Sequence, residues 1–276
     1  MVAMTYSTRF KVAASELAEI RDVSHLACQW PSRAARSNLE AAEDDSHSSL
    51  SWNSVHEALV SQPLNEAGFQ VGFSFMRASL FWTDDAGGYG EFPLAHQMES
   101  TIGDWLDNQL AAVGLKPATA AEMPYTLEHA EAYYLLDHQP LQLAALGDWF
   151  EHAHSTLDVL ALDWQDDAVS PLAQRCWPHH FDIAVLVPLQ QGDPETAPSI
   201  GVGLSPGDGS YAEPYFYCTP WPAPGAASLP PAPEPFHWHT QGFTSLVCPA
   251  GRLDDESPTE AMLRSAYRVS GEVLST

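Results

Sequence analysis

The sequence has very little positive charge. Of its 276 residues only 11 are lysine or arginine, against 36 aspartate and glutamate residues, so the formal net charge is −25 at pH 7. Lysine occurs only at Lys11 and Lys116. Such an acidic surface repels phosphate backbones and anionic lipid heads, so we expect no role in nucleic-acid or membrane-surface binding. The charge could instead reflect adaptation to salt or attract a cationic partner.

Paired cysteines and long apolar runs are also missing. The four cysteines (Cys28, Cys176, Cys218 and Cys248) are far apart, so there is no C-x-x-C motif for zinc or redox chemistry. Isolated cysteines are typical of a reducing cytosol, and we expect a cytoplasmic protein. The first residues lack the apolar stretch of a secretion signal. No apolar run approaches the length of about 18 residues that predicts a membrane-spanning helix.

Apolar and aromatic residues, in contrast, are plentiful. Hydrophobic residues make up 45% of the chain, with nine Trp, nine Tyr and eleven Phe. This content predicts a single compact domain over residues 1–276, with possible halves at 1–120 and 121–276. The order of strand-like and helix-like segments predicts an α+β fold. We expect two antiparallel β-meander-plus-helix halves joined by central helices.

Local periodicity predicts the individual elements. A first helix over 11–30 should end at Trp30-Pro31, because the residue before a proline disfavours the helical conformation, and 32–50 should be a mobile surface segment. Two-residue alternation predicts strands over 52–60, 69–75, 79–83, 91–94, 181–189, 200–204, 215–219 and 243–247. Three- and four-residue spacing predicts helices over 96–113, 127–137, 141–162 and 257–273. Seven prolines between Pro220 and Pro235 predict an extended surface loop.

Several short motifs resemble one bacterial protein family. The motifs are Phe181-Asp182-Ile183-Ala184, Pro206-Gly207-Asp208 and Glu213-Pro214-x-Phe216-Tyr217, followed by the C-terminal helix. Their order is similar to that of an uncharacterised family described as a domain of unknown function. The resemblance runs over most of the chain from about Ser51 onward. It implies a soluble bacterial α+β protein and brings no assigned activity or catalytic residues.

A group of histidines and an aspartate is the main candidate site. Alternate residues of an extended segment share a face, so His180 and Asp182 should point together, as should His237 and His239. On neighbouring strands, these four residues would supply ligands for Zn²⁺, Fe²⁺, Mn²⁺ or Ni²⁺, with Glu213 as a candidate base. The alternative is a polar cluster in which the same side chains hydrogen-bond one another and the backbone.

Two other motifs carry weaker chemical hypotheses. Cys176 close to His179 could form a thiolate–imidazole pair, or it could simply pack in the core. Gly203–Gly207 matches a nucleophile elbow, but Pro206 lacks the required N–H and a strand follows, so we expect a hairpin turn. The sequence therefore predicts an uncharacterised protein with a small-molecule pocket. It could be a divalent-metal-dependent enzyme, or a non-enzymatic ligand-binding or protein-interaction module with structural histidines.

Overall fold

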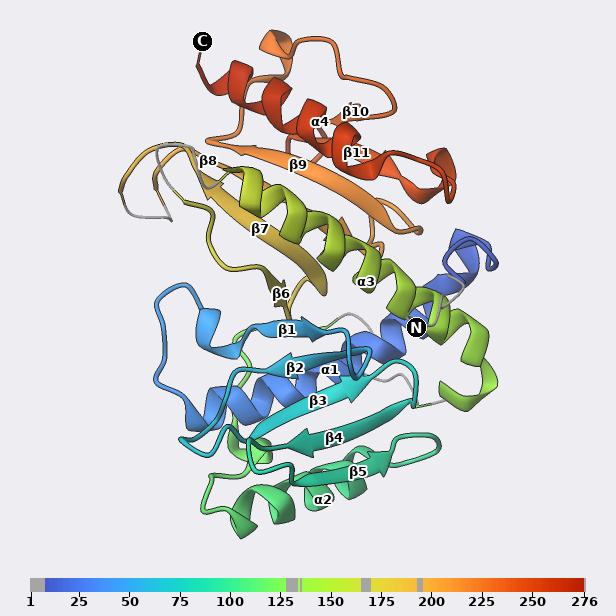
Figure 1. The fold of residues 1–276 in the computed structure, drawn as a ribbon, viewed down its shortest axis with the longest axis vertical. Coiled ribbons are helices and arrows are strands. Elements are labelled where there is room, and N and C mark those ends of the chain that lie inside the picture. The colour runs from blue at the N-terminus through green and yellow to red at the C-terminus, as the bar shows by residue number, and fades with distance from the viewer. Residues whose placement is uncertain (1–7, 128–133, 135, 165–169, 193–195, 276) are drawn as a thin grey trace. The chain divides into compact units, whose positions relative to one another are not determined.

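Helices and antiparallel strands make up the protein, which confirms the α+β class (Figure 1). The computed structural model describes residues 8–127, 134, 136–164, 170–192 and 196–275. The chain divides into two compact units. Unit 1 comprises Met1–Glu151 and Cys176–Phe181, and unit 2 comprises His152–Arg175 and Asp182–Thr276.

Unit 1 contains an antiparallel sheet with the strand order β6-β1-β2-β3-β4-β5. Its strands are β1 (Leu50–Asn53), β2 (Ala58–Ser61), β3 (Gln70–Ser74), β4 (Ser79–Thr83), β5 (Tyr89–Pro93) and β6 (Arg175–Trp177). Large apolar residues at alternate positions, such as Phe73 and Leu80, are cross-strand partners and are fully buried. The two-residue period of the sequence therefore predicts this core face.

The helices of unit 1 are α1 (Ala18–Asn38), α2 (Glu99–Ala112) and the first part of α3 (Pro140–Asp163), with short 3-10 turns η1 (Ala14–Leu17), η2 (Ser46–Ser48), η3 (Ala118–Ala120) and η4 (Leu136–His138). The rings of His25 in α1 and Phe150 in α3 both contact Phe181, with ring-centre distances of 5.0 and 5.2 Å. Gly114 follows the C-cap residue of α2, and its φ of +75° suits a glycine just after a helix.

Unit 2 contains an antiparallel sheet with the order β10-β11-β9-β8-β7. Its strands are β7 (Asp182–Pro188), β8 (Ser199–Ser205), β9 (Tyr215–Trp221), β10 (His237–His239) and β11 (Ser245–Pro249). The end of α3 and α4 (Thr259–Leu274) supply its helices, with η6 (Ala226–Ser228) and η7 (Ala250–Arg252) as short turns. The proline-rich segment is mostly exposed, as predicted.

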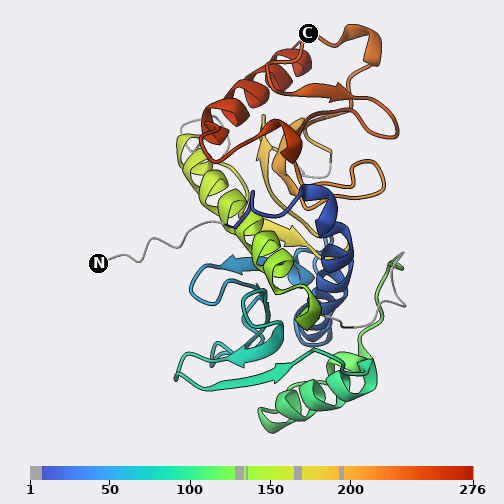
Figure 2. The same cartoon turned by 90° about the vertical axis from the view of Figure 1, so that its right-hand side faces the viewer.

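The two faces of the unit 2 sheet differ. α3 and α4 lie on the same side of β7–β9 (Figures 1 and 2). His152 of α3 contacts the Phe216 ring on that side, and α4 lies against β8 and β9. Side chains alternate along a strand, so Gly203 and its partner Tyr217 lie on the other side. Val247 of β11 pairs with Tyr217, and His237 of β10 pairs with Val247, so His237 lies on this side too. We call this side the open face of unit 2.

Two predictions about the N-terminal part are wrong. α1 does not end at Pro31 but runs through it to Asn38. A proline inside a helix costs about 3 kcal/mol, but the following turn buries Ser32, Ala34 and Ala35, and this packing offsets the loss. Residues 32–50 are therefore not a mobile surface segment. They contain the end of α1, η2 and the start of β1.

The strand predicted over 52–60 is also wrong, because two strands occupy this region. β1 and β2 are joined by a tight turn in which Glu57 has a φ of +44°, and this turn reverses the chain. The predicted helices over 96–113, 141–162 and 257–273 are confirmed as α2, α3 and α4. The helix predicted over 127–137 lies largely outside the described residues.

Candidate functional site

A phenol and a carboxylate meet across three strands of the open face of unit 2. Gly203 of β8 and Tyr217 of β9 are register partners, and the Tyr217 hydroxyl donates a hydrogen bond to Oδ2 of Asp182 in β7. The side chain of Tyr217 can cross β8 only because residue 203 is glycine. A Cβ there would lie 2.7 Å from the Tyr217 hydroxyl and 2.6 Å from the Ile183 carbonyl oxygen. Burial, and then the Asp182 carboxylate, raise the pKa of Tyr217, so its phenol keeps the proton it donates.

The loop between β8 and β9 places a second tyrosine. Oδ1 of Asp208 accepts hydrogen bonds from the backbone N–H groups of Ser210 at 2.7 Å and Tyr211 at 3.0 Å. The hydroxyl of Tyr215 donates to Oδ2 of the same carboxylate at 2.6 Å. Asp208 thus holds the loop in the turn that its sequence predicts, and it fixes the position of Tyr211.

Tyr211 meets two of the predicted site residues, His237 and His239. The Tyr211 hydroxyl lies 2.9 Å from Nε2 of His237 and 3.0 Å from Nδ1 of His239. The two histidines point to the same side because they are alternate residues of β10, as predicted. We call these three residues the Tyr211 cluster.

The protons of the Tyr211 cluster can be assigned from its partners. His239 Nε2 lies 2.7 Å from the carbonyl oxygen of Gln241, which can only accept, so Nε2 carries the proton of the neutral ring. Nδ1 of His239 then accepts from the Tyr211 hydroxyl, and that oxygen accepts from Nε2–H of His237. The result is a directed chain in which each donor has one acceptor.

The environment keeps this chain neutral. Burial first, then the proximity of Arg252 and His239, lower the pKa of His237. Burial, followed by the negative charge of Asp208, raises the pKa of Tyr211. Both shifts favour the uncharged forms, which matches the proton assignment.

Glu213, the predicted base, contacts backbone in the structure. Its Oε2 accepts a hydrogen bond from the Gly251 N–H at 2.6 Å, and the Ala250 N–H donates to the Pro214 carbonyl at 2.7 Å. These bonds join the start of β9 to η7. Its role as a base stays a prediction.

The expectation that His180 and Asp182 share a strand face is wrong. Residues 178–181 form a turn, Phe181 has a φ of +60°, and β7 begins only at Asp182. Alternation does not continue through a turn, so the spacing of the two residues says nothing about a common face. His180 is exposed, and its ring centre lies 4.1 Å from that of His179.

A second polar cluster, in unit 1, is not among the sequence predictions. His25, Gln29, Ser32 and Arg36 follow one another along one side of α1 at helical spacing. The side chains of His25 and Gln29 both donate to the Pro178 carbonyl, at 2.7 and 2.9 Å, which anchors the turn over 178–181. The pattern is visible in the sequence but is hidden by the assumption that Pro31 ends the helix.

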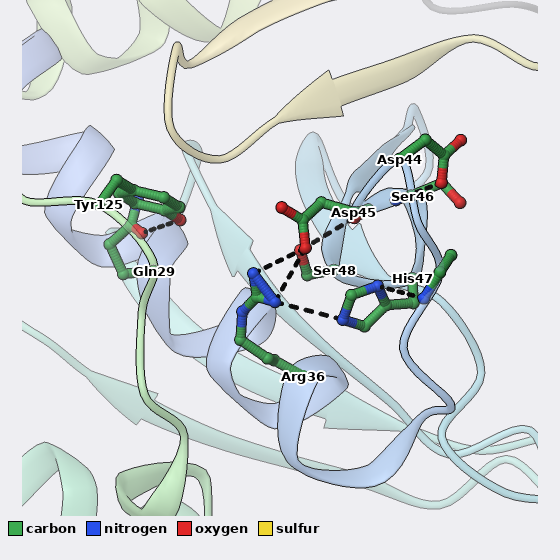
Figure 3. Close-up of polar contacts among 9 residues, drawn as sticks. Gln29, Arg36, Asp44, Asp45, Ser46, His47, Ser48 and Tyr125 are labelled. Carbon is green, nitrogen blue, oxygen red and sulfur yellow. Dashed lines mark hydrogen bonds and ion pairs between the residues drawn. The ribbon is translucent and has the colours of Figure 1, made fainter. Parts of the chain in front are cut away.

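Arg36 and His47 form the centre of this cluster (Figure 3). Nη1 and Nη2 of Arg36 both donate to Oδ1 of Asp45, at 3.0 and 2.8 Å. Nδ1 of His47 accepts from the Ala42 N–H at 3.1 Å, so Nε2 carries the proton of the neutral ring. The 3.4 Å contact between Arg36 Nη1 and His47 Nε2 therefore joins two donors. We call Arg36, Asp45 and His47 the Arg36 cluster.

The described residues hold no ready-made metal-ligand group of the usual donor types. Within 8–127, 134, 136–164, 170–192 and 196–275, no group of three or more His, Cys, Asp or Glu side chains is arranged to hold a metal ion. The predicted set of His180, Asp182, His237 and His239 is therefore not found as a ligand group there. His237 and His239 could hold a metal only with a further ligand type, and Tyr211 is the group they face.

Comparisons with known proteins leave the chain's family open. No family model, curated protein or solved structure matches it. The resemblance to a bacterial family of unknown function stays a prediction. In the part of the chain that the structure describes, no helix is both long and apolar enough to cross a membrane.

Proposed function

We propose that the protein binds a small molecule through a divalent metal ion held by Tyr211, His237 and His239. One observation carries the proposal. Two imidazole nitrogens from alternate residues of β10 lie 2.9 and 3.0 Å from the same phenol oxygen. The Gln241 carbonyl fixes the His239 tautomer with Nδ1 free of its proton, which is the usual arrangement of a metal-ligating histidine.

The distances favour some metals over others. With metal–ligand bonds of about 2.1 Å, neighbouring ligands are about 3.0 Å apart in an octahedron and about 3.4 Å apart in a tetrahedron. The separations of 2.9 and 3.0 Å match the octahedral value. Ni²⁺, Fe²⁺ and Mn²⁺ would therefore fit with less movement than tetrahedral Zn²⁺.

Two costs limit the expected affinity. The metal must displace the proton of the Tyr211 hydroxyl, and this is harder because burial raises the pKa of Tyr211. It must also move the His237 proton to Nδ1, which is buried and has no hydrogen-bond partner among the described residues. An unsatisfied buried donor costs about 1–3 kcal/mol. We therefore expect a dissociation constant in the micromolar range, with affinity rising as the pH rises.

The metal would supply the chemistry that the side chains lack. Three protein ligands leave open positions at an octahedral ion, where an oxygen of the small molecule can bind and be polarised. The same ion could activate a water molecule, so the site would suit an enzyme as well as a binding protein. The Asp208 loop holds Tyr211 in place on the open face of unit 2.

The test is a titration of tag-free protein with Ni²⁺, Mn²⁺ and Zn²⁺, followed by calorimetry. We expect one site per chain, with Ni²⁺ binding most tightly. His237→Ala and Tyr211→Phe should each weaken binding at least about tenfold. His154→Ala removes a histidine of α3 in the same unit and serves as the matched control. Equal binding by His237→Ala and His154→Ala, or no saturable binding at all, would contradict the proposal.

A second candidate function needs no metal. It is supported by the complete proton assignment of the chain from His237 through Tyr211 to His239, which leaves Tyr211 and His239 satisfied without an ion. In this case the histidines are structural and hold the loop at Tyr211, and the protein is a ligand-binding or interaction module. His237→Ala would then lower the free energy of unfolding without any metal-dependent difference between the variants.

Further properties of the chain belong to the same proposal. We infer that two meander-plus-helix halves build the fold, because each unit has an antiparallel sheet with helices. A cytoplasmic location is supported by the four cysteines, which are all buried and form no disulfide. The net charge of −25 argues for a small-molecule partner rather than a nucleic acid.

A further inference from the structure

A cleft in unit 2 lies between α4 and the neighbouring ends of β7 and β8. It has a volume of about 380 Å³, within the range of roughly 300–1,000 Å³ that is usual for small-molecule sites. Its lining is Pro188, Leu189, Ile200, Tyr267, Arg268, Gly271 and Ser275. The cleft is separate from the Tyr211 cluster, because none of that cluster's residues line it.

Gly271 is an unusual residue for its position in this cleft. It lies inside α4, where glycine costs about 1 kcal/mol relative to alanine. Packing does not require it, because a Cβ at this position would meet only Cδ1 of Ile200, at an ordinary 3.9 Å. The glycine therefore weakens the helix without relieving a clash, and its effect is to keep the floor of the cleft open.

Arg268 lies one turn before Gly271 and supplies the charge. It is exposed, and its guanidinium forms no ion pair or hydrogen bond with any residue the structure describes. The sequence contains only nine arginines among 36 acidic residues, so an arginine with no acidic partner among the described residues is not explained by the charge balance.

We propose that this cleft binds a small amphiphilic carboxylate. The carboxylate pairs with the Arg268 guanidinium, whose planar fork matches two carboxylate oxygens. The hydrocarbon part lies over Gly271 and against the apolar side chains of the lining, which are Pro188, Leu189 and Ile200. The ring of Tyr267 borders the same space and is held by Trp164, with ring centres 4.5 Å apart.

The experiment compares octanoate with 1-octanol, an uncharged molecule of equal chain length, by NMR titration of the full chain. We expect octanoate to bind saturably and octanol to bind at least about tenfold more weakly. Arg268→Gln should lower octanoate affinity to the octanol level and leave octanol unchanged. Gly271→Leu should fill the floor and abolish binding of both.

Arg264→Gln is the matched control, because Arg264 lies one turn earlier on α4 and is already paired with Asp163. It should leave octanoate binding unchanged. Gly271→Leu is not expected to unfold the protein, since it replaces glycine by a good helix former, and a thermal melt checks this. The proposal is overturned if octanoate does not bind saturably, if Arg268→Gln and Arg264→Gln behave alike, or if folded Gly271→Leu still binds.

Discussion

The Arg36 cluster of unit 1 and the Tyr211 cluster of unit 2 differ in the balance of their hydrogen bonds. In the Tyr211 cluster each donor faces one acceptor, so three uncharged side chains close a chain. In the Arg36 cluster two donor nitrogens, Nη1 of Arg36 and Nε2 of His47, lie 3.4 Å apart, and Nε of Arg36 is buried without a partner among the described residues. Among the described residues, Arg36 donates within this cluster only to Asp45.

This difference indicates which kind of interaction holds each cluster together. A balanced set of neutral groups depends on close and well-aligned packing, because each bond is directional. A cluster with more donors than acceptors is held mainly by the attraction between opposite charges. An acceptor oxygen placed between Arg36 and His47 would accept a hydrogen bond from each of them. We therefore expect unit 2 to respond most to steric changes, and unit 1 to respond to pH and to charge.

The largest expected effect comes from a steric change in unit 2. Gly203→Val places side-chain carbon where Tyr217 crosses β8, and a Cβ there lies 2.6 Å from the Ile183 carbonyl oxygen. Backbone cannot move aside easily, so we expect the free energy of unfolding to fall by about 4 kcal/mol. Urea denaturation measures this change.

Gly201→Ala is the matched control in the same strand. The nearest atom to a Cβ at Gly201 is 4.0 Å away, so the variant should be near neutral. Equal losses in the two variants would mean that glycine matters in β8 for general strand reasons, and not for the passage of Tyr217 to Asp182.

The two clusters also differ in how far the sequence predicts them. His237 and His239 are two residues apart in one strand, so the spacing alone places them together. Tyr211 comes from a loop, and no local period predicts that its hydroxyl reaches between them. Local spacing therefore predicts the two ligand-like residues but not the group that joins them.

The polar side of α1 that ends in Arg36 (His25, Gln29, Ser32 and Arg36) was not predicted, for a different reason. Its helical spacing crosses Pro31, and the preference of a proline for ending a helix is a local rule that packing in the folded protein can override. At Phe181 the error is the opposite one, because a predicted strand is interrupted where the sequence shows no break. Its positive φ interrupts an apparently continuous strand, so His180 and Asp182 do not alternate. The average spacing of apolar residues is enough to predict the fold class. Predicting a site also requires the positions where the chain departs from that spacing.

The second prediction concerns the pH response of unit 1. Burial, and then the positive charges of His180 and Arg36, lower the pKa of His179 to about 4. The unfolded chain takes up a proton near pH 6.5, but the folded protein does not until about pH 4. Stability from this group is therefore full above about pH 6.5 and falls as the pH drops towards 4. Because His179 is only partly buried, we expect a loss of about 2 kcal/mol over this window.

His179→Gln should remove that part of the pH dependence. Denaturant unfolding at pH 7 and at pH 4.5 measures it, with the exposed His138→Gln as the control. The variant should lose less stability on acidification than the wild type, whereas the control should follow the wild type. An unchanged slope in His179→Gln would mean that His179 is not the group that responds to acid in unit 1.

The smallest expected effect compares two carboxylates. Asp45 accepts from a charged guanidinium, but its side chain is 47% exposed, and exposed ion pairs contribute about 0–1 kcal/mol. Asp182 accepts from the Tyr217 phenol on the open face of unit 2, where burial raises the phenol pKa. A hydrogen bond to a charged group in such a place contributes about 1.5–3 kcal/mol.

Asp45→Asn should therefore cost about 0.5 kcal/mol, less than Asp182→Asn, although Asp45 is the residue with a charged partner. Asparagine also tolerates the positive φ of 56° at position 45, so no backbone strain is added. Added salt should shrink the Asp45→Asn effect and leave that of Asp182→Asn nearly unchanged, since screening acts on exposed charges. A larger loss for Asp45→Asn at both salt concentrations would reverse the comparison and make charge in unit 1 the stronger interaction.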